Sequence, residues 1–281
     1  MTAQAIDLSA IFSGRISTTE DEQSYHQKTL GVVSKSALDK VARTPAHYRA
    51  WVNGYEGKPS AAMDFGRAFH MALLEPVKYA QRYAVAPDFG DLRYKANKEK
   101  RIEWIAANDG KDFIDRDDAS RIADMVKSVM SHPTGARLIA EGESEVTLRW
   151  TDSETGLPCK SRADRWVKAK RLVVDAKTTE DASPEGFARS VAKYRYHVQD
   201  ALYRAGFLAC GEPIDHFALL AVEKEPPYAV AVYTLDADAV ARGYALARAN
   251  IETLQTCLER DEWLAYSNGV SELSLPRWAQ T

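Results

Sequence analysis

The 281-residue sequence has no apolar run that approaches the roughly 18 residues needed to cross a membrane. Its beginning also lacks the basic segment and apolar core of a secretory signal. These two absences favour a protein that stays in the cytoplasm.

Cysteine is scarce, with only Cys159, Cys210 and Cys257 in the chain. The three are scattered, show no CxxC spacing and are odd in number, so they match neither a zinc site nor a disulfide framework. An iron–sulfur cluster held by four cysteines would need one ligand more than the sequence has. We therefore expect reduced thiols and no iron–sulfur cluster.

The sequence also lacks the basic excess typical of nucleic-acid-binding proteins, because 37 Lys and Arg stand against 40 Asp and Glu, for a net charge of −3. Any contact with nucleic acid must then come from local basic segments, and residues 92–101 and 159–171 are two of them. Each segment alone is better explained as a solvated face than as a binding site. Their basic residues are Arg93, Lys95, Lys98, Lys100 and Arg101 in the first, and Lys160, Arg162, Arg165, Lys168, Lys170 and Arg171 in the second.

The secondary-structure pattern changes near residue 145, from helical periodicity to strand-like alternation. Residues 1–30 are polar and weakly patterned, so we expect a loosely ordered N-terminal arm followed by a single domain over 31–281. Predicted helices cover 36–54 (broken at Pro45), 61–75, 95–107, 117–140, 184–192, 197–210 and 236–264. Predicted strands cover 145–150, 159–167, 171–178, 216–223 and 228–234. This order predicts an α/β (α+β mixed) fold, with a central mixed sheet flanked by helices and an N-terminal helical extension.

Asp175 and Lys177 lie two residues apart in the apolar segment RLVVDAKT, so they point to the same face of a predicted strand. An aspartate in such a strand is costly unless its charge is compensated. A hairpin turn at 168–170 would place Asp164 opposite Asp175, with β-carbons about 5 Å apart. Carboxylates that close repel each other, and their oxygens suit Mg²⁺ or Mn²⁺.

Two other interpretations of these residues stay open from the pattern alone. Asp164 has arginines on both sides, at Arg162 and Arg165, either of which would form an ion pair with it. Asp175 and Lys177 also fit a solvent-facing pair of charges on an edge strand.

The segment ETGLPCKSRADRWVKAKRLVVDAKTTEDASPEGFARSVAKYRYHVQDALYRAG resembles the nuclease core of the exonuclease VIII (RecE) family. That family belongs to the PD-(D/E)xK nucleases and is related to phage lambda exonuclease. Three further segments fit it: VSKSALDKVARTPAHYRAW, GRAFHMALLEP with its GxxxH element, and LPRWA near the end. The resemblance implies a restriction-endonuclease-like core and an origin in a phage or prophage.

The resemblance also implies roles for individual residues. His70, Asp164 and Asp175 would ligate metal, Lys177 would stand beside the attacking water, and Gln199 would adjoin the site, with a further acid at Glu145. Taken alone, His70, Gln199 and Tyr203 also fit packed helix positions, and helix capping alone explains Ser34 and Ser36. The residues expected to contact DNA are Ser34, Lys35, Ser36, Lys98, Lys100, Arg101, Arg162 and Tyr203.

The implied activity is Mg²⁺-dependent hydrolysis of one strand of linear double-stranded DNA from a 5′ end, with Mn²⁺ as a substitute. The product would be 3′ single strands for a partner annealing protein in recombination. Family members form rings, so a homo-oligomer is implied. One alternative is a restriction-like or structure-specific endonuclease on the same core. The other is a non-catalytic DNA-binding protein, against which the joint presence of Asp164, Asp175 and Lys177 argues.

Overall fold

The computed structural model describes residues 14–55, 61–267 and 269–275. Residues 1–13 of the expected arm and most of the LPRWA segment therefore lie outside the described residues. Within the described ranges, no helix combines the length and the apolar character needed to cross a membrane.

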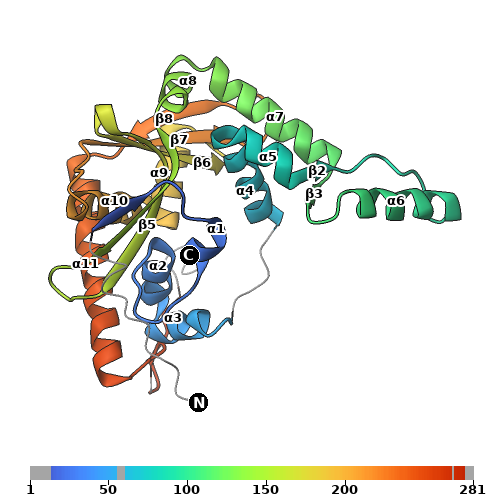
Figure 1. The fold of residues 1–281 in the computed structure, drawn as a ribbon. Coiled ribbons are helices and arrows are strands. Elements are labelled where there is room, and N and C mark those ends of the chain that lie inside the picture. Colours follow the sequence, from blue (N-terminus) through green and yellow to red (C-terminus); the bar gives the residue numbers. More distant parts are fainter. Residues whose placement is uncertain (1–13, 56–60, 268, 276–281) are drawn as a thin grey trace.

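A six-stranded mixed sheet forms the centre of the fold, as the alternating pattern predicts (Figure 1). Its strand order is β1-β4-β5-β6-β7-β8; β6 and β7 pair in parallel, and the other neighbours are antiparallel. The strands are β1 (Arg15–Ser17), β4 (Glu143–Thr151), β5 (Pro158–Val167), β6 (Leu172–Thr179), β7 (His216–Glu223) and β8 (Val230–Thr234).

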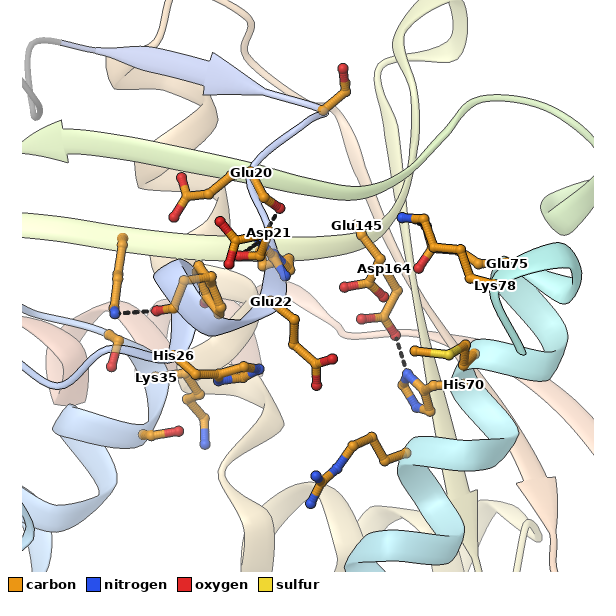
Figure 2. Close-up of a pocket in the computed structure, with 18 of the residues that line it drawn as sticks. Glu20, Asp21, Glu22, His26, Lys35, His70, Glu75, Lys78, Glu145 and Asp164 are labelled. Atoms are coloured by element: carbon orange, nitrogen blue, oxygen red, sulfur yellow. Dashed lines mark hydrogen bonds and ion pairs between the residues drawn. The ribbon is translucent and has the colours of Figure 1, made fainter. Parts of the chain in front are cut away.

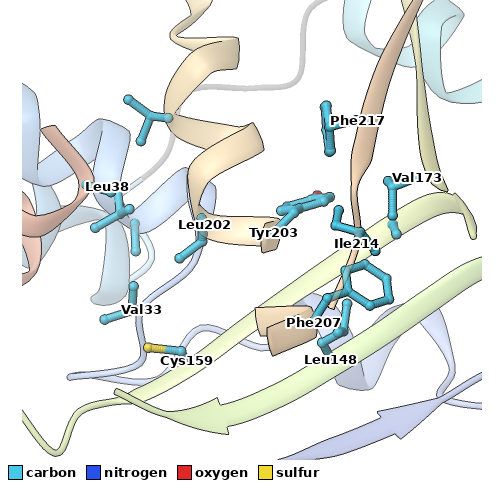
Figure 3. Packing of buried hydrophobic residues seen from close by; sticks show 14 of the residues in the cluster. Val33, Leu38, Leu148, Cys159, Val173, Leu202, Tyr203, Phe207, Ile214 and Phe217 are labelled. Carbon is cyan, nitrogen blue, oxygen red and sulfur yellow. The ribbon is translucent and has the colours of Figure 1, made fainter. Parts of the chain in front are cut away.

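Helices cover both faces of the sheet, because the central strands bury apolar residues on both sides. In β7, Phe217 and Leu219 belong to one core cluster, whereas Ala218 and Leu220 belong to the other. The first cluster, shown in part in Figure 3, joins the sheet to α2 (Lys35–Arg43), α3 (Pro45–Val52), α9 (Pro184–Tyr194), α10 (Tyr196–Ala209) and α11 (Ala237–Arg260). The second joins it to α4 (Ala61–Leu74), α7 (Arg116–Ser131) and α8 (Pro133–Ala140).

Proline sets several helix boundaries. The predicted break at Pro45 is confirmed, since α2 ends at Arg43 and α3 begins at Pro45. Pro133 divides the single helix expected over 117–140 into α7 and α8, and Pro76 begins a further helix, α5 (Pro76–Arg82). The reason is the same each time: proline has no N–H to donate inside a helix but suits the first helical position.

A projecting arm carries the first basic segment away from the sheet (Figure 1). It consists of the parallel pair β2 (Tyr83–Val85) and β3 (Asp112–Ile114) and of α6 (Lys95–Ala107), none of whose residues is buried. The predicted boundaries of this helix match the structure.

The N-terminal region departs from the loose arm expected for 1–30. Over its described part, β1 pairs with the edge strand β4, and α1 (Glu22–His26) follows with Asp21 as its N-cap. We call residues 18–27 the strap. Its order has a physical cause: Arg149 of β4 forms an ion pair with Glu20, and Lys160 and Arg162 of β5 donate to carbonyls of the strap.

Candidate active site

Three neighbouring strands each contribute one acid at the same level of the sheet: Glu145 from β4, Asp164 from β5 and Asp175 from β6. Arg165 pairs with Val174, which is the register expected from the sequence. The ladder ends at that pair, however, and the Asp164 carboxylate accepts the N–H of Ala176 at 2.8 Å. Asp164 and Asp175 are therefore not the regular cross-strand pair that we expected, because Asp164 turns to satisfy a backbone donor that the ladder leaves unpaired.

Glu145 lies opposite Asp164 in the β4–β5 register, between the pairs Ser144–Arg165 and Val146–Ala163. Its φ of 53° is left-handed, which is unusual for a residue with a side chain. Such a conformation costs about 1–3 kcal/mol and is concentrated at functional sites. The local strain supports a role for Glu145 beside Asp164.

Asp175 is fully buried on β6, between β5 and β7, so it does not lie on an edge strand. Its Oδ1 accepts a hydrogen bond from Gln199 Nε2 at 2.5 Å, and its Oδ2 forms an ion pair with Lys177. The ammonium of Lys177 lies 4.7 Å from the centre of the Tyr196 ring. A buried carboxylate is thus held between an amide and a cation, which is the compensation that its position demands.

His70 projects from α4 toward the same acids (Figure 2). Its Nδ1 lies 3.3 Å from Asp164 Oδ2. It therefore faces the acids, whereas its neighbour Phe69 is fully buried in the second core cluster. The alternative of a packed core histidine does not fit this position.

The electrostatics reflect crowded negative charge. Burial, reinforced by the charge of Asp175, raises the pKa of Asp164 to about 6. Burial and the charge of Asp164 raise the pKa of Glu145 to about 8. Burial alone would lower the pKa of Lys177, but the carboxylates of Asp175 and Asp164 outweigh it and raise that pKa. Asp164 and Glu145 therefore hold protons or need a nearby cation, whereas Lys177 stays charged.

The metal-free protein is expected to lose stability as the pH rises toward 8. In the folded state Asp164 and Glu145 have pKa values of about 6 and about 8, above their ordinary values of 3.8 and 4.5. Between these limits the native state holds more protons than the unfolded state, so the free energy of unfolding falls as the pH rises. Thermal unfolding in chelator from pH 5 to pH 8 measures this. Glu145→Gln should flatten the decline between pH 6 and 8; an equally steep decline in that variant would contradict the assignment.

His70, Glu145, Asp164 and Gln199 line a cavity of about 950 Å³, whereas Asp175 and Lys177 are not among its lining residues. The strap forms one wall and α4 with α5 forms the other, while the strands and α10 form the floor (Figure 2). Among the residues predicted for the site, those lining the cavity are Ser34, Lys35, Ser36, His70, Glu145, Arg162, Asp164, Gln199 and Tyr203. Lys98, Lys100 and Arg101 lie on the projecting α6 and do not line it.

Several predicted DNA contacts have structural partners of their own. Ser34 is the N-cap of α2 and accepts from Ala37 N at 3.2 Å. Lys35 pairs with Asp39 at 2.5 Å, and the Tyr203 hydroxyl donates to the carbonyl of Arg162 at 2.7 Å. At the β5–β6 turn, Lys168, Lys170 and Arg171 each pair with a carboxylate. Three of the six cations of the second basic segment are thus neutralised by ion pairs.

A divalent metal fits the chemistry of the floor. Asp164 and Glu145 repel each other, and His70 offers a nitrogen beside them. In the part of the chain that the structure describes, no three His, Cys, Asp or Glu side chains are yet arranged as a complete metal-binding group. The two oxygens of Asp175 contact Gln199 and Lys177. A cation bound through Asp175 would compete with Lys177 for the carboxylate.

Neither Tyr196 nor the strap was identified from the sequence. Tyr196 precedes Gln199 by three residues, so helical spacing places the two on one face of α10, and this pattern would have identified it. No local pattern indicates that the strap folds against β4 and β5, because its contacts come from residues more than a hundred positions away.

Replacing His70 with Ala is expected to weaken metal-dependent activity and to leave stability nearly unchanged. The imidazole faces the acids and makes little core contact, so its loss removes a ligand without opening a cavity. Activity titrated against Mg²⁺ and Mn²⁺ should show a higher metal requirement, with partial recovery at high Mn²⁺. An unchanged metal dependence, together with a lower unfolding temperature, would return His70 to a structural role.

The sheet, its helical layers and the acids followed by Lys177 define a PD-(D/E)xK-type domain. Residues 34–274 match the DUF3799 family, described as a PDDEXK-like domain of unknown function, and the chain belongs to this family. This confirms the PD-(D/E)xK part of the resemblance and the fold expected from it. It does not extend to the exonuclease VIII branch.

Solved structures agree at the level of the fold. A protein from Eubacterium rectale, named as a candidate exonuclease, is 13% identical, with a TM-score of 0.57 over 94% of this chain and 98% of its own. A phage-related exonuclease from Haemophilus somnus is 12% identical over 62% of this chain and 92% of its own, but its TM-score of 0.33 is too low to support an argument. No curated protein sequence matches the chain.

Proposed function

We propose that this protein is a divalent-metal-dependent exodeoxyribonuclease that hydrolyses one strand of linear double-stranded DNA in the 5′→3′ direction. The observation that supports it best is the buried set of Asp175, Lys177 and Gln199 next to Asp164, of which Gln199 and Asp164 line the cavity. The exonuclease name of the Eubacterium rectale protein, which shares the fold, agrees with it.

His70, Glu145, Asp164 and Asp175 are the residues that would hold Mg²⁺, or Mn²⁺ in its place. The metal, when bound, supplies positive charge that polarises the scissile phosphate and lowers the pKa of water. A water oxygen bonds to phosphorus, and the bond from phosphorus to one flanking sugar oxygen breaks. Lys177 offsets the negative charge that grows on the phosphate oxygens, and Tyr196 restrains the ammonium in place. Gln199 orients Asp175 by its hydrogen bond.

The cavity favours a single strand over a duplex. Its volume of about 950 Å³ lies in the range of sites for small ligands, which suits a few nucleotides. A DNA end supplies such a strand readily, because unpairing terminal bases costs only a few kcal/mol. An end-dependent exonuclease is therefore preferred over an endonuclease on the same fold.

Digestion of end-labelled linear duplex tests the proposal. With Mg²⁺, label at a 5′ end should be released first, and a 5′-phosphate end should be degraded faster than a 5′-hydroxyl end. Ser34, Lys35 and Ser36 at the cavity are the candidates for holding that terminal phosphate. Release of internal fragments before end label would favour the endonuclease, and no release would favour the non-catalytic DNA-binding protein.

The resemblance to the exonuclease VIII family extends the proposal to partners. The 3′ single strands would pass to a single-strand annealing protein in recombination, in the cytoplasm of a cell that carries the phage or prophage. A homo-oligomeric ring would keep the DNA threaded. Sedimentation of the pure protein measures its oligomeric state. A monomer at all concentrations would contradict the proposed ring.

DNA binding is expected to weaken steeply with salt, through the exposed cations of the arm. Lys98, Lys100 and Arg101 lie on α6 outside the cavity, where duplex beyond the bound end would lie. Each phosphate contact contributes about 0.9 to the slope of log K against log salt for duplex DNA. Replacing all three with Ala should lower the slope by about 2 to 3 in duplex-binding titrations. An unchanged slope would make the arm an ordinary solvated helix.

A further inference from the structure

Apart from Lys35, which pairs with Asp39, the lysines and arginines of the cavity divide into two groups, and the strap accounts for the first. Lys160 donates to the carbonyl of Gln27 at 2.8 Å, and Arg162 donates to the carbonyl of Glu20 at 2.8 Å. The Tyr25 ring lies 4.3 Å from the Arg162 guanidinium and 5.1 Å from the Lys160 ammonium. Both cations are 7–8% exposed. Lys160 and Arg162 hold the strap in place, so their charged groups are largely inaccessible to a ligand.

The second group lies on the opposite wall and is accessible. Arg67 projects from α4, one turn before His70, and Lys78 and Arg82 project from α5. Their side chains are 43%, 65% and 31% exposed. Lys78 lies next to Glu75, with which it pairs, and both line the cavity (Figure 2). This wall, unlike the strap wall, therefore presents cations to the cavity.

The partners of these three cations are acids, and each ion pair is at least partly exposed, with Glu75 the most buried of the acids. Arg67 pairs with Asp64 at 3.0 Å, Lys78 pairs with Glu75, and Arg82 pairs with Asp112 at 2.7 Å and with Glu22. Exposed ion pairs are weak, so an incoming anion exchanges with them readily. A guanidinium also matches the two oxygens of a phosphodiester in the way that it matches a carboxylate.

Glu22 is the exception among these acids, because it comes from the strap, on the other side of the cavity. Figure 2 shows its carboxylate reaching from α1 into the space in front of His70. Its pair with Arg82 joins residues sixty positions apart across the two walls. A carboxylate in this place stands where a phosphate of a bound strand would meet Arg82.

We propose that Arg67, Lys78 and Arg82 form a track for the phosphates of a single DNA strand in the cavity, and that Glu22 competes with the strand for Arg82. The proposal rests on the proposed function for the identity of the ligand. The track runs along α4 and α5, beside His70 and the acids of the floor, so it leads the strand to the reacting groups. Glu22 makes binding weaker than the track alone would allow.

Binding of a short fluorescent single-stranded oligonucleotide in chelator, titrated at several salt concentrations, tests the track. For single strands each lost phosphate contact lowers the salt slope by about 0.7. Arg67→Gln, Lys78→Gln and Arg82→Gln should each lower it by about that amount, whereas Lys95→Gln on the projecting arm should not. Arg82→Lys keeps the charge and should keep the slope, which separates loss of charge from loss of fold.

Glu22→Gln tests the competition, with the same probe. It should tighten binding by up to about fivefold, the upper range of an exposed ion pair. The gain should disappear in the Arg82→Gln background, because the two changes act on one contact. Glu99→Gln, which removes an equal charge outside the cavity, should give no gain.

Three results would each overturn the track. They are unchanged salt slopes in the three wall variants, a gain in binding from Glu22→Gln that persists in the Arg82→Gln background, and no binding of the oligonucleotide by the unmodified protein. These measurements contain no metal and no cleavage, so they are independent of whether the protein releases nucleotides with Mg²⁺. If the protein cleaves DNA but the salt slopes are unchanged, only the track is wrong. If the protein binds the strand as described but never cleaves DNA, the proposed function is wrong.

Discussion

Replacing Asp175 with Asn is expected to reduce Mg²⁺-dependent digestion of DNA by about 10³-fold. The carboxylate is fully buried, lies next to Asp164 and is the partner of both Lys177 and Gln199. The amide removes the negative charge that a metal and the ammonium both need, while it keeps the size of the side chain. Acid-soluble nucleotide release from linear duplex measures the effect.

The same substitution is expected to lower stability in chelator by about 1–3 kcal/mol, because the buried ammonium of Lys177 loses its charged partner. Charge crowding alone predicts the opposite, since one of two neighbouring anions is removed. The ion pair seen in the structure decides the sign. Thermal unfolding in chelator measures it.

Asp200→Asn is the matched control for both effects. Asp200 is also fully buried, lies on α10 and pairs with Arg204 away from the cavity lining. This variant should lose stability and keep activity. Equal activity in the Asp175 and Asp200 variants would remove Asp175 from the reaction.

A covalently closed plasmid is expected to survive conditions under which the same plasmid, once linearised, is digested from its ends to mononucleotides and residual 3′ single strands. The cavity suits a few nucleotides of one strand, and the strap and α5 wall it on two sides. A strand enters such a site most easily from an end, where only terminal bases must unpair. Opening an interior segment requires unstacking on both flanks, so continuous duplex is a poor substrate.

Gel analysis of both substrates at equal Mg²⁺ checks this expectation. A plasmid with one double-strand break should shorten progressively. A circular single-stranded DNA separates the two possible barriers, because it contains no duplex to open and no end to thread. Nicking or linearisation of the closed plasmid at the rate of linear digestion would establish the endonuclease instead.

Much of the fold follows from local patterns. The alternation in 145–150 and the branched, apolar runs in 171–178 and 216–223 predict strands, and the structure has β4, β6 and β7 there. The β5–β6 register also agreed, because the turn at 168–170 is built from residues close in sequence. Such features depend on neighbours in the chain, which is why a sequence reveals them.

The parts that the sequence did not reveal depend on distant partners. The Asp164 carboxylate accepts a hydrogen bond from the N–H of Ala176. Whether this bond forms depends on how far β5 and β6 separate beyond the end of their ladder. Arg149, Lys160 and Arg162 hold the strap in place. The sequence of residues 18–27 alone does not predict these contacts. Arg162 was expected to contact DNA from its charge, but its geometry ties it to the strap.

Nucleotide release from uniformly labelled linear duplex, with Mg²⁺ or with chelator, tests the central claim most directly: that this PDDEXK-like domain is a metal-dependent nuclease acting through Asp164, Asp175 and Lys177. The account predicts release with Mg²⁺, none with chelator, and none from the variants Asp164→Asn and Lys177→Met at matched folding. Release that persists in chelator, or no release from the unmodified protein with either Mg²⁺ or Mn²⁺, would contradict it.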